Sequence, residues 1–213
     1  LVAAGALAFS DAVPLVRFRA QAMQEAVPAG EGAMAAIMGL EADAVRELCL
    51  EAAQGQVVEA ANLNAPGQIV IAGAKAAVER AGELAKARGA KRALLLPVSA
   101  PFHCALMRPA AERLAQRLAD VSICKPEIEV INNVDVAVYA EPEKIRDALV
   151  RQAFSPVRWI ELIQAMAGRG MSHVIECGPG KVLAGMTKRI AREVEGGSAH
   201  DAASLEQSIA AVR

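Results

Sequence analysis

Hydrophobic and polar positions between Pro28 and Ser99 switch repeatedly between the period of a strand and the period of a helix. Four short apolar runs predict strands, at residues 34–40, 57–63, 68–72 and 93–98. Two charged segments with a single apolar face predict helices, at residues 41–54 and 75–88. The turn signal Asn64-Ala65-Pro66-Gly67 separates the second strand from the third. The order β-α-β-β-α-β predicts a compact ferredoxin-like subdomain over residues 29–98.

Longer helical patterns flank this unit on both sides. Ser10-Asp11 supplies an N-cap, and apolar positions follow it at helical spacing: Val13, Val16, Ala20 and Met23. Further helices are predicted at residues 104–120, 141–152, 155–166, 182–192 and 204–212, and further strands at residues 128–132 and 172–177. Strands that alternate with helices predict the α/β class, with a mainly parallel sheet covered by helices on both faces.

Composition narrows the class of protein. Hydrophobic residues make up 54% of the 213 residues and aromatic residues only 3%, a balance that alanine-rich helices packed closely on a sheet would give. No apolar run approaches the roughly 18 residues that span a bilayer, and no signal peptide is present. The net charge of −1 gives no global attraction for nucleic acid. We therefore expect a soluble protein of one or two domains that binds neither a membrane nor a nucleic acid.

The cysteines and the start of the chain lead to two further expectations. Four cysteines and three histidines are dispersed without any C-x-x-C pair, which argues against a metal site and favours reduced thiols in the cytoplasm. The chain begins with the apolar stretch Leu1–Leu7 and without an initiator methionine, as if cut from the middle of an apolar helix. We interpret the sequence as a fragment, and we expect its incomplete α/β core to expose apolar surface.

Residues 94–107 supply the first candidate for chemistry. An apolar run ends in Pro97 and Pro101, and His103 follows at the start of a predicted helix. The N-terminal end of a helix or the edge of a strand can hold a general base rigidly while the base still reaches a substrate. The alternative is a histidine packed in a structural junction, and spacing alone leaves both interpretations open.

Arg19 is the second candidate, because it lies three residues after Val16 and four before Met23 on the predicted inward face. A buried cation needs an anion, since an unpaired buried charge is costly. The anion is either a carboxylate of the protein, in a salt bridge, or the carboxylate of a substrate held by the guanidinium fork. The sequence favours neither.

Three other groups have weaker functional interpretations. Gly178-Pro179-Gly180 fits no phosphate-loop template and is interpreted as a tight strand-to-helix turn. Asn62, Asn64 and Gln68 could donate hydrogen bonds into a cleft, although turn chemistry explains them nearly as well. The basic residues are interpreted as solvated helix faces, or as a landing patch for an acidic partner: Lys188, Arg189 and Arg192, and likewise Lys86, Arg88, Lys91 and Arg92.

Six stretches of the sequence, taken in order, resemble the malonyl-CoA:acyl-carrier-protein transacylases of fatty acid synthesis. They are Arg19–Pro28, Asn62–Gln68, Pro97–Met107, Ile131–Val134, Val150–Gln152 and Glu176–Leu183. The collinear match runs from Leu1 to about Arg192. The resemblance implies a hydrolase-like α/β core with a ferredoxin-like insert. The division that we expect is residues 1–28 and 99–192 in the large subdomain, 29–98 in the small subdomain, and 193–213 as a C-terminal tail.

The resemblance also implies a reaction. A serine takes malonyl from coenzyme A as an ester and passes it to the phosphopantetheine thiol of acyl carrier protein. His103 would be the base that activates the serine and then the thiol, and the backbone carbonyl of Gln152 would fix its tautomer. Arg19 would hold the malonyl carboxylate, and Phe102 would disfavour a branched acyl group. The implied substrate site comprises Arg19, Met23, Asn62, Asn64, Gln68 and Phe102. The implied partners of a monomeric enzyme are acyl carrier protein and malonyl-CoA, with no resident cofactor or metal.

The sequence departs from this family at the nucleophile. The family's serine lies in a G-H-S-x-G elbow, and no G-x-S-x-G occurs in these 213 residues. Ser99 follows a strand but lacks the elbow glycines and lies only four residues from His103. We therefore expect these residues alone not to turn over malonyl-CoA. Two alternatives stay open: a non-catalytic module that binds carrier protein or acyl-CoA, and an acyltransferase domain of a polyketide synthase.

Overall fold

The computed structural model describes residues 1–213, in which helices and strands are interspersed along the chain. The helices are α1 (Phe9–Glu25), α2 (Ala42–Ala53), α3 (Lys75–Ala87), α4 (Arg108–Ala119), α5 (Pro142–Arg151), α6 (Trp159–Gly168), α7 (Ala184–Ile190) and α8 (Ala202–Ala211). A short 3₁₀ helix, η1 (Ala105–Met107), precedes α4. The strands are β1 (Gly32–Met38), β2 (Val58–Ala65), β3 (Gln68–Ala74), β4 (Arg92–Leu95), β5 (Ile131–Asn132), β6 (Ala137–Val138), β7 (His173–Cys177) and β8 (Glu195–Ala199). Every helix predicted from periodicity is present, although several helices begin or end at other residues than predicted.

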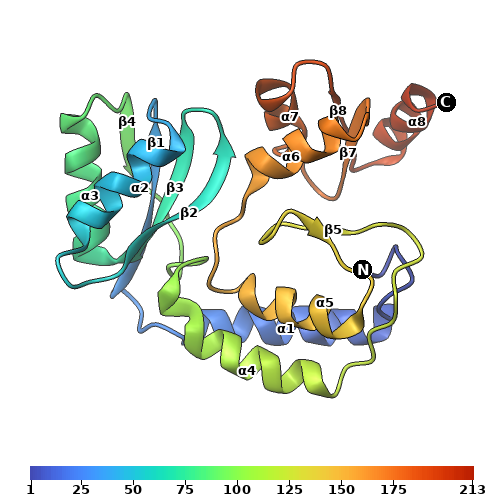
Figure 1. Cartoon of the computed structure of the whole chain (residues 1–213), viewed down its shortest axis with the longest axis horizontal. Helices are drawn as coiled ribbons and strands as arrows, with labels where there is room; N and C mark the ends of the chain where they lie inside the picture. The colour runs from blue at the N-terminus through green and yellow to red at the C-terminus, as the bar shows by residue number, and fades with distance from the viewer.

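The first sheet contains four antiparallel strands in the order β2-β3-β1-β4. The turn at Pro66-Gly67 joins β2 directly to β3, and so short a connection permits only antiparallel pairing. The predicted order of strands and helices in this unit is confirmed. Figure 1 places α2 and α3 together beside the sheet, at one end of the molecule.

The two faces of this sheet have different neighbours. One face packs against α2 and α3 through a core that includes Ile37, Leu48, Ile69 and Val78. The opposite face packs Met34, Val70 and Ala72 against Cys104. Since Cys104 is the residue after His103, this second face supports the loop that carries the candidate base.

Helices α1, α4 and α5 form a layer along the base of the molecule (Figure 1). Leu15 of α1, Leu114 and Leu118 of α4, and Ile145 of α5 meet in one cluster. Met23, Met107 and Ala153 meet in a second cluster nearer the sheet. The layer therefore fixes α1 and the end of α5 relative to the His103 loop.

The predicted inward face of α1 is wrong in part. The buried residues are Ala12, Leu15, Ala22 and Met23. Val13 and Val16, which we expected inside, are 54% and 64% exposed, and Ala20 is exposed as well. The helix has two apolar stripes about 100° apart, and α4 covers only one of them. The helix also begins at Phe9 without a side-chain cap, so the predicted Ser10-Asp11 cap is absent.

The expected mainly parallel sheet is also wrong for these residues. Parallel pairing occurs between β7 and β8 and at a single bridge between Asn62 and Val157. The apolar run 128–132 is not a buried strand, because only β5 is extended and its sole partner is the two-residue strand β6. Without a neighbour on both sides, an apolar run gains no buried-strand environment.

Strand β8 was not predicted, because Gly196-Gly197 suggested a break in the chain. These glycines instead allow close packing. A Cβ on Gly196 would lie 2.5 Å from the carbonyl oxygen of Ala184, and one on Gly197 would lie 2.7 Å from Cδ1 of Ile175. Glycine inside a strand is typical of such a close approach.

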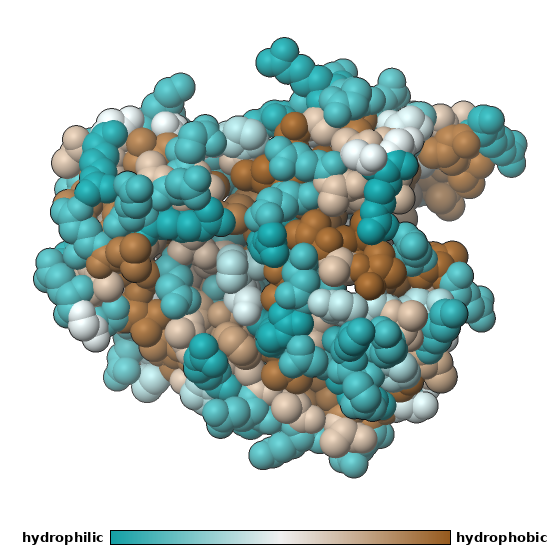
Figure 2. Space-filling view, viewed as in Figure 1, coloured by the Kyte–Doolittle hydropathy of each residue, from teal (hydrophilic) through white to brown (hydrophobic).

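None of the helices combines the length and the hydropathy that a bilayer-spanning segment needs. On the face shown in Figure 2, hydrophobic side chains gather around the notch between the C-terminal unit and the helices at the base. Together with the exposed stripe of α1, this matches the expectation of exposed apolar surface.

Candidate active site

The loop that carries His103 is locked on both sides of the histidine. Before it, the carbonyl oxygen of Pro101 accepts a hydrogen bond from Sγ of Cys104 at 3.1 Å. After it, the backbone N–H of Ala105 donates to Oε2 of Glu59 on β2 at 2.9 Å. His103 itself has a φ of +61°, in the left-handed region that residues other than glycine rarely adopt. The loop therefore holds the imidazole in a strained and defined place.

The imidazole contacts the end of α5. Nδ1 of His103 lies 3.0 Å from the backbone carbonyl oxygen of Gln152, the residue that follows α5. A carbonyl oxygen only accepts, so Nδ1 carries the proton in this hydrogen bond. The neutral ring then has an unprotonated Nε2, which is the arrangement a general base requires.

Burial and charge keep the ring neutral. Desolvation is the largest effect and lowers the pKa of His103, and the positive charge of Arg19 lowers it further. The hydrogen bond with Gln152 and the backbone at Ser155 act in the opposite direction and raise this pKa. The net shift is downward, so the imidazole is neutral at physiological pH.

Arg19 lies on α1 between Leu15 and Met23, one helical turn from each. Its side chain is half-buried, and burial alone lowers the pKa of its guanidinium. No acidic residue contributes to that shift, so the protein carboxylate that the sequence left open as a partner is not found. Arg19 and Gln152 both line an apolar cavity of about 350 Å³ between α1, α4 and α5. The guanidinium is thus available to an anion from outside the chain.

The remaining sequence-predicted residues are in different situations. Asn62 and Asn64 are half-buried on β2, and Asn62 bridges to Val157 in the segment after Gln152. Phe102 is half-buried and packs between the clusters on either side of the loop. Met23 is 3% exposed and packs against the cluster that holds Met107, so it supports the site from within the core.

Gln68 is held by the C-terminal unit. Its Oε1 accepts a hydrogen bond of 2.6 Å from Nη1 of Arg189 on α7, and Nη2 of Arg189 also reaches the carbonyl oxygen of Pro66. Gln68 therefore joins the β2–β3 turn to α7. Arg189, interpreted from sequence as part of a solvated face, has a specific partner.

Sequence reasoning missed a polar cluster beside Gln152. The guanidinium of Arg151 binds both carboxylate oxygens of Asp135, each at 2.7 Å. Asp135 lies in the turn between β5 and β6. The only sequence signal was the polar run Asn132-Asn133 followed by Asp135, with nothing to connect it to residue 151.

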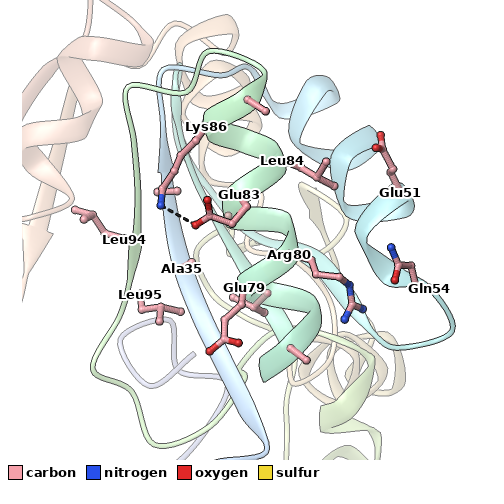
Figure 3. A pocket seen from close by; sticks show the side chains of 15 residues that line it. Ala35, Glu51, Gln54, Glu79, Arg80, Glu83, Leu84, Lys86, Leu94 and Leu95 are labelled. Atoms are coloured by element: carbon pink, nitrogen blue, oxygen red, sulfur yellow. Dashed lines mark hydrogen bonds and ion pairs between the residues drawn. The ribbon is translucent and has the colours of Figure 1, made fainter.

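A separate groove of about 1080 Å³ lies between α3 and β4 (Figure 3). Leu94 and Leu95 line one side, and Glu79 and Glu83 line the other, with Lys86 paired to Glu83 at 2.8 Å. Ala35 places this groove on the α2–α3 face of the sheet, opposite the His103 loop. No group of three potential metal-ligating side chains comes together anywhere in the chain.

Comparisons with known proteins identify the family of the chain. The acyl transferase domain family matches residues 1–207. A malonyl CoA-acyl carrier protein transacylase of Escherichia coli strain K12 is 57% identical over 190 residues, which cover 89% of this chain and 62% of that protein. The corresponding protein of Bacillus subtilis strain 168 is 48% identical over 210 residues, 98% of this chain and 66% of that protein. The chain therefore spans about two thirds of the length of these relatives.

Solved structures match as well. A crystal structure of an acyl-carrier-protein S-malonyltransferase from Burkholderia pseudomallei 1710b superposes with a TM-score of 0.96 at 61% identity, over 98% of this chain and 68% of that one. A malonyl-transacylase in complex with a type II polyketide synthase acyl carrier protein gives a TM-score of 0.97 at 49% identity, over 99% of this chain and 68% of that one. The fold is thus the α/β fold of these structures, and the chain belongs to the malonyl-CoA–acyl carrier protein transacylase family of acyl transferase domains.

Proposed function

We propose that the protein transfers a malonyl group from coenzyme A to the phosphopantetheine thiol of acyl carrier protein, through a seryl-enzyme ester, in fatty acid biosynthesis. The observation that carries the proposal is the 3.0 Å hydrogen bond between Nδ1 of His103 and the carbonyl of Gln152, close to Arg19, which has no acidic partner in the protein. The family supports the reaction class. The chain holds the base and the carboxylate site, while its 213 residues contain no serine elbow. The serine would belong to the remainder of the whole protein.

His103 would act twice as a base and twice as an acid. Its Nε2 removes the serine hydroxyl proton as Oγ attacks the thioester carbonyl carbon. It then gives that proton to the departing coenzyme A thiolate, which leaves the malonyl ester on the serine. In the second half, Nε2 takes the proton of the phosphopantetheine thiol, whose sulfur attacks the ester, and returns it to the serine oxygen. The Gln152 carbonyl accepts the Nδ1–H throughout and stabilises the imidazolium.

Arg19 would select the acyl group. Malonyl carries a free carboxylate that acetyl lacks, and a half-buried guanidinium without a partner favours an acyl group that neutralises it. Phe102, next to His103, would place bulk beside the thioester and disfavour a methyl branch. Asn62, Asn64 and Met23 would line or support the same pocket. Gln68 is a weaker candidate for substrate binding, because its side-chain oxygen already accepts a hydrogen bond from Arg189.

The subdomain division is part of this proposal. The sheet order β2-β3-β1-β4 with two helices on one face supports a ferredoxin-like small subdomain at residues 29–98. Residues 1–28 and 99–192 would belong to the large, hydrolase-like subdomain. The C-terminal segment 193–213, which we expect as a tail, contains β8 and α8, and β8 pairs with β7.

The partner that we propose is an acyl carrier protein, and the proposed acyl donor is malonyl-CoA. We also propose that the enzyme is a monomer and acts in the cytoplasm. The relative solved in complex with an acyl carrier protein supports the partner. Four free cysteines, two of them buried, suit a reducing compartment.

A second candidate function is favoured by the missing elbow: non-catalytic binding of carrier protein or acyl-CoA. Titration of the 213-residue chain with holo acyl carrier protein at two salt concentrations separates the two. Salt-sensitive binding without any effect of His103→Ala would support the binding module. Acyl transfer by the whole protein would support the enzyme.

The deciding experiment uses the whole protein that contains this chain. We expect it to malonylate holo acyl carrier protein, as followed by intact mass, and His103→Ala to reduce kcat by at least about a thousandfold. His173→Ala is the matched control, because His173 lies on β7 beside Glu195 and should leave the rate unchanged. Since burial lowers the pKa of His103, kcat/KM should rise with pH to a midpoint below 6.5 and then level off. Full activity in His103→Ala would contradict the proposal.

A further inference from the structure

We propose that Asp135 and Arg151 are positioning residues for His103: their ion pair fixes the end of α5, and with it the carbonyl oxygen that selects the imidazole tautomer. The inference rests on the proposed function for its catalytic meaning. Its physical content, the state of the His103 ring, can be measured without any turnover.

The first step is the place of Arg151 in the chain. It is the last residue of α5, and Gln152, whose carbonyl contacts His103, follows directly. The carbonyls at the end of a helix lack intrahelical partners and the last turn frays readily. The Gln152 carbonyl therefore needs support from outside the helix to stay 3.0 Å from Nδ1 of His103.

The second step is the quality of that support. Nη1 and Nη2 of Arg151 each donate to one oxygen of Asp135 at 2.7 Å, and Nε donates to Asp147 at 2.6 Å. The Arg151 and Asp135 side chains are 29% and 28% exposed, well below the exposure of most ion pairs of the chain. A bidentate pair in this environment fixes direction as well as distance. The hydrogen bond from Arg151 is the largest cause that lowers the pKa of Asp135.

The third step is that Asp135 itself is held in place. The side-chain oxygen of Asn132 accepts from the backbone N–H of Asp135 at 2.8 Å, and the hydroxyl of Tyr139 donates to Oδ2 of Asp135 at 3.0 Å. The next residue, Val136, has a φ of +56°, a conformation that is costly for a β-branched side chain. A strained turn that persists is over-determined by its surroundings. The β5–β6 turn is therefore a rigid anchor.

The fourth step is that the same turn holds the chain beyond Gln152. The backbone N–H of Arg158 donates to the carbonyl of Asn133 at 3.2 Å, and its Nη1 donates to the carbonyl of Val134 at 3.0 Å. Between these anchors, Val157 is hydrogen-bonded to β2 in both directions. The segment from Gln152 to Arg158 is thus held at both ends by the β5–β6 turn. The Arg151–Asp135 ion pair is the contact closest to the Gln152 carbonyl.

The competing explanation is an ion pair that stabilises the fold and has no effect on the imidazole. The two explanations differ in the state of the His103 ring. If the pair positions the carbonyl, then weakening it lets the Nδ1 hydrogen bond lengthen, which removes an interaction that raises the pKa of His103. The pKa should then fall further and the Nε2–H tautomer should become populated. A purely structural pair would change the unfolding midpoint and leave the ring unaltered.

The experiment is a ¹⁵N-histidine NMR titration of the 213-residue chain. Its three histidines give separate signals for His103, His173 and His200, and the latter two serve as internal references. The variants are Asp135→Asn, which keeps the shape and removes the charge, and Arg151→Lys, which keeps the charge and removes the fork. Two charged groups near the His103 loop stay the same in both variants: Arg19 on α1, which lowers the pKa of His103, and Glu59 on β2, which accepts a hydrogen bond from the backbone N–H of Ala105.

We expect native His103 to carry its proton on Nδ1, and both variants to show a mixture of tautomers and a lowered His103 pKa. Asp135→Glu should restore the native signals in part. The matched control is Glu143→Gln, which breaks the 2.7 Å pair with Arg146 at the other end of α5 and should leave the ring unchanged. If one variant does not fold, the other decides. A folded variant with the native tautomer and pKa would overturn the inference.

The whole protein gives the second readout. Both variants should lower kcat by on the order of tenfold to a hundredfold with little change in the KM for malonyl-CoA, because a misplaced base affects chemistry more than binding. The acid limb of the pH profile should move in the direction of the NMR shift. If the ring responds as expected and the whole protein transfers no malonyl group, the positioning holds and the proposed function fails. If the ring is unchanged and the whole protein is active, the positioning role fails and the proposed function holds.

Discussion

At the scale of single residues, the site depends on opposed effects on one imidazole. Burial and Arg19 favour the neutral ring, while Gln152 favours the proton. Because the carbonyl binds Nδ1, the proton that could be gained or lost in catalysis is confined to Nε2. In our proposal Arg19 thus has two effects: it attracts the carboxylate of the substrate, and its charge contributes to the lowered pKa of His103.

Arg19→Ala tests the first of these effects. We expect the whole protein with this change to lose most of its preference for malonyl-CoA over acetyl-CoA, by about tenfold to a thousandfold in the ratio of kcat/KM, since the guanidinium is the group that a malonyl carboxylate would neutralise. Steady-state kinetics with both donors gives the ratio.

The control for this change is Arg17→Ala. Arg17 is exposed on the same helix, two residues away and pointing elsewhere, so its removal should leave the donor preference as it was. An Arg19→Ala enzyme with the native preference would remove Arg19 from the substrate site.

At the scale of elements, periodicity predicted the helices and the four-stranded unit well, because those patterns depend on local spacing. The failures have physical causes. α1 carries two apolar stripes, and only packing against α4 decides which one is buried. β8 has glycines that look like a break but permit the close approach of Ala184 and Ile175.

Gly196→Ala tests the packing of β8. The added methyl group would lie 2.5 Å from a backbone oxygen in α7, which cannot move without the helix. We expect the free energy of unfolding to fall by about 1–3 kcal/mol, measured by urea denaturation followed by circular dichroism.

Gly185→Ala is the matched substitution, one residue after the contacted Ala184. Gly185 is inside α7, and a methyl group added to it would have no other atom within 4 Å. Alanine favours the helix over glycine, so this variant should be unchanged or more stable by up to about 1 kcal/mol. Equal destabilisation in both would show that the Gly196 contact is not the cause.

The candidate site could be predicted from sequence only where resemblance connected distant residues. His103 and Gln152 are 49 residues apart, and no spacing rule joins a histidine to a particular backbone carbonyl. The prediction that Arg19 lies on the inward face rested on its spacing from Val16 and Met23. Met23 is buried as expected, but Val16 is exposed. The Asp135–Arg151 pair was missed because it joins a turn to a helix end, a contact that only the folded chain defines.

At the scale of the whole molecule, an apolar stripe of α1 faces solvent. Phe9 is 71% exposed, and Val13 and Val16 lie one and two turns along the same side. Contiguous apolar surface of this kind promotes association. The chain covers 62% of the length of its Escherichia coli relative, so that relative contains residues that have no counterpart in these 213.

Val16→Lys should therefore reduce self-association of the 213-residue chain. We expect a lower weight-average mass in light scattering at high protein concentration, with little change in the unfolding midpoint, because the native side chain buries little surface. Leu50→Lys is the control: Leu50 is 79% exposed but lies on α2 and not on the stripe of α1, so its replacement should have no effect on mass. An unchanged mass in Val16→Lys would show that the stripe does not drive association.

The backbone of His103 has a conformation that costs stability. With φ at +61°, the residue adopts a conformation that glycine takes freely and that costs most side chains about 1 kcal/mol. Glycine at this position would relieve that strain and remove the only imidazole near Arg19. If His103 is the general base that we propose, the site therefore keeps this imidazole at the cost of that strain, and His103→Gly should recover it as a higher free energy of unfolding.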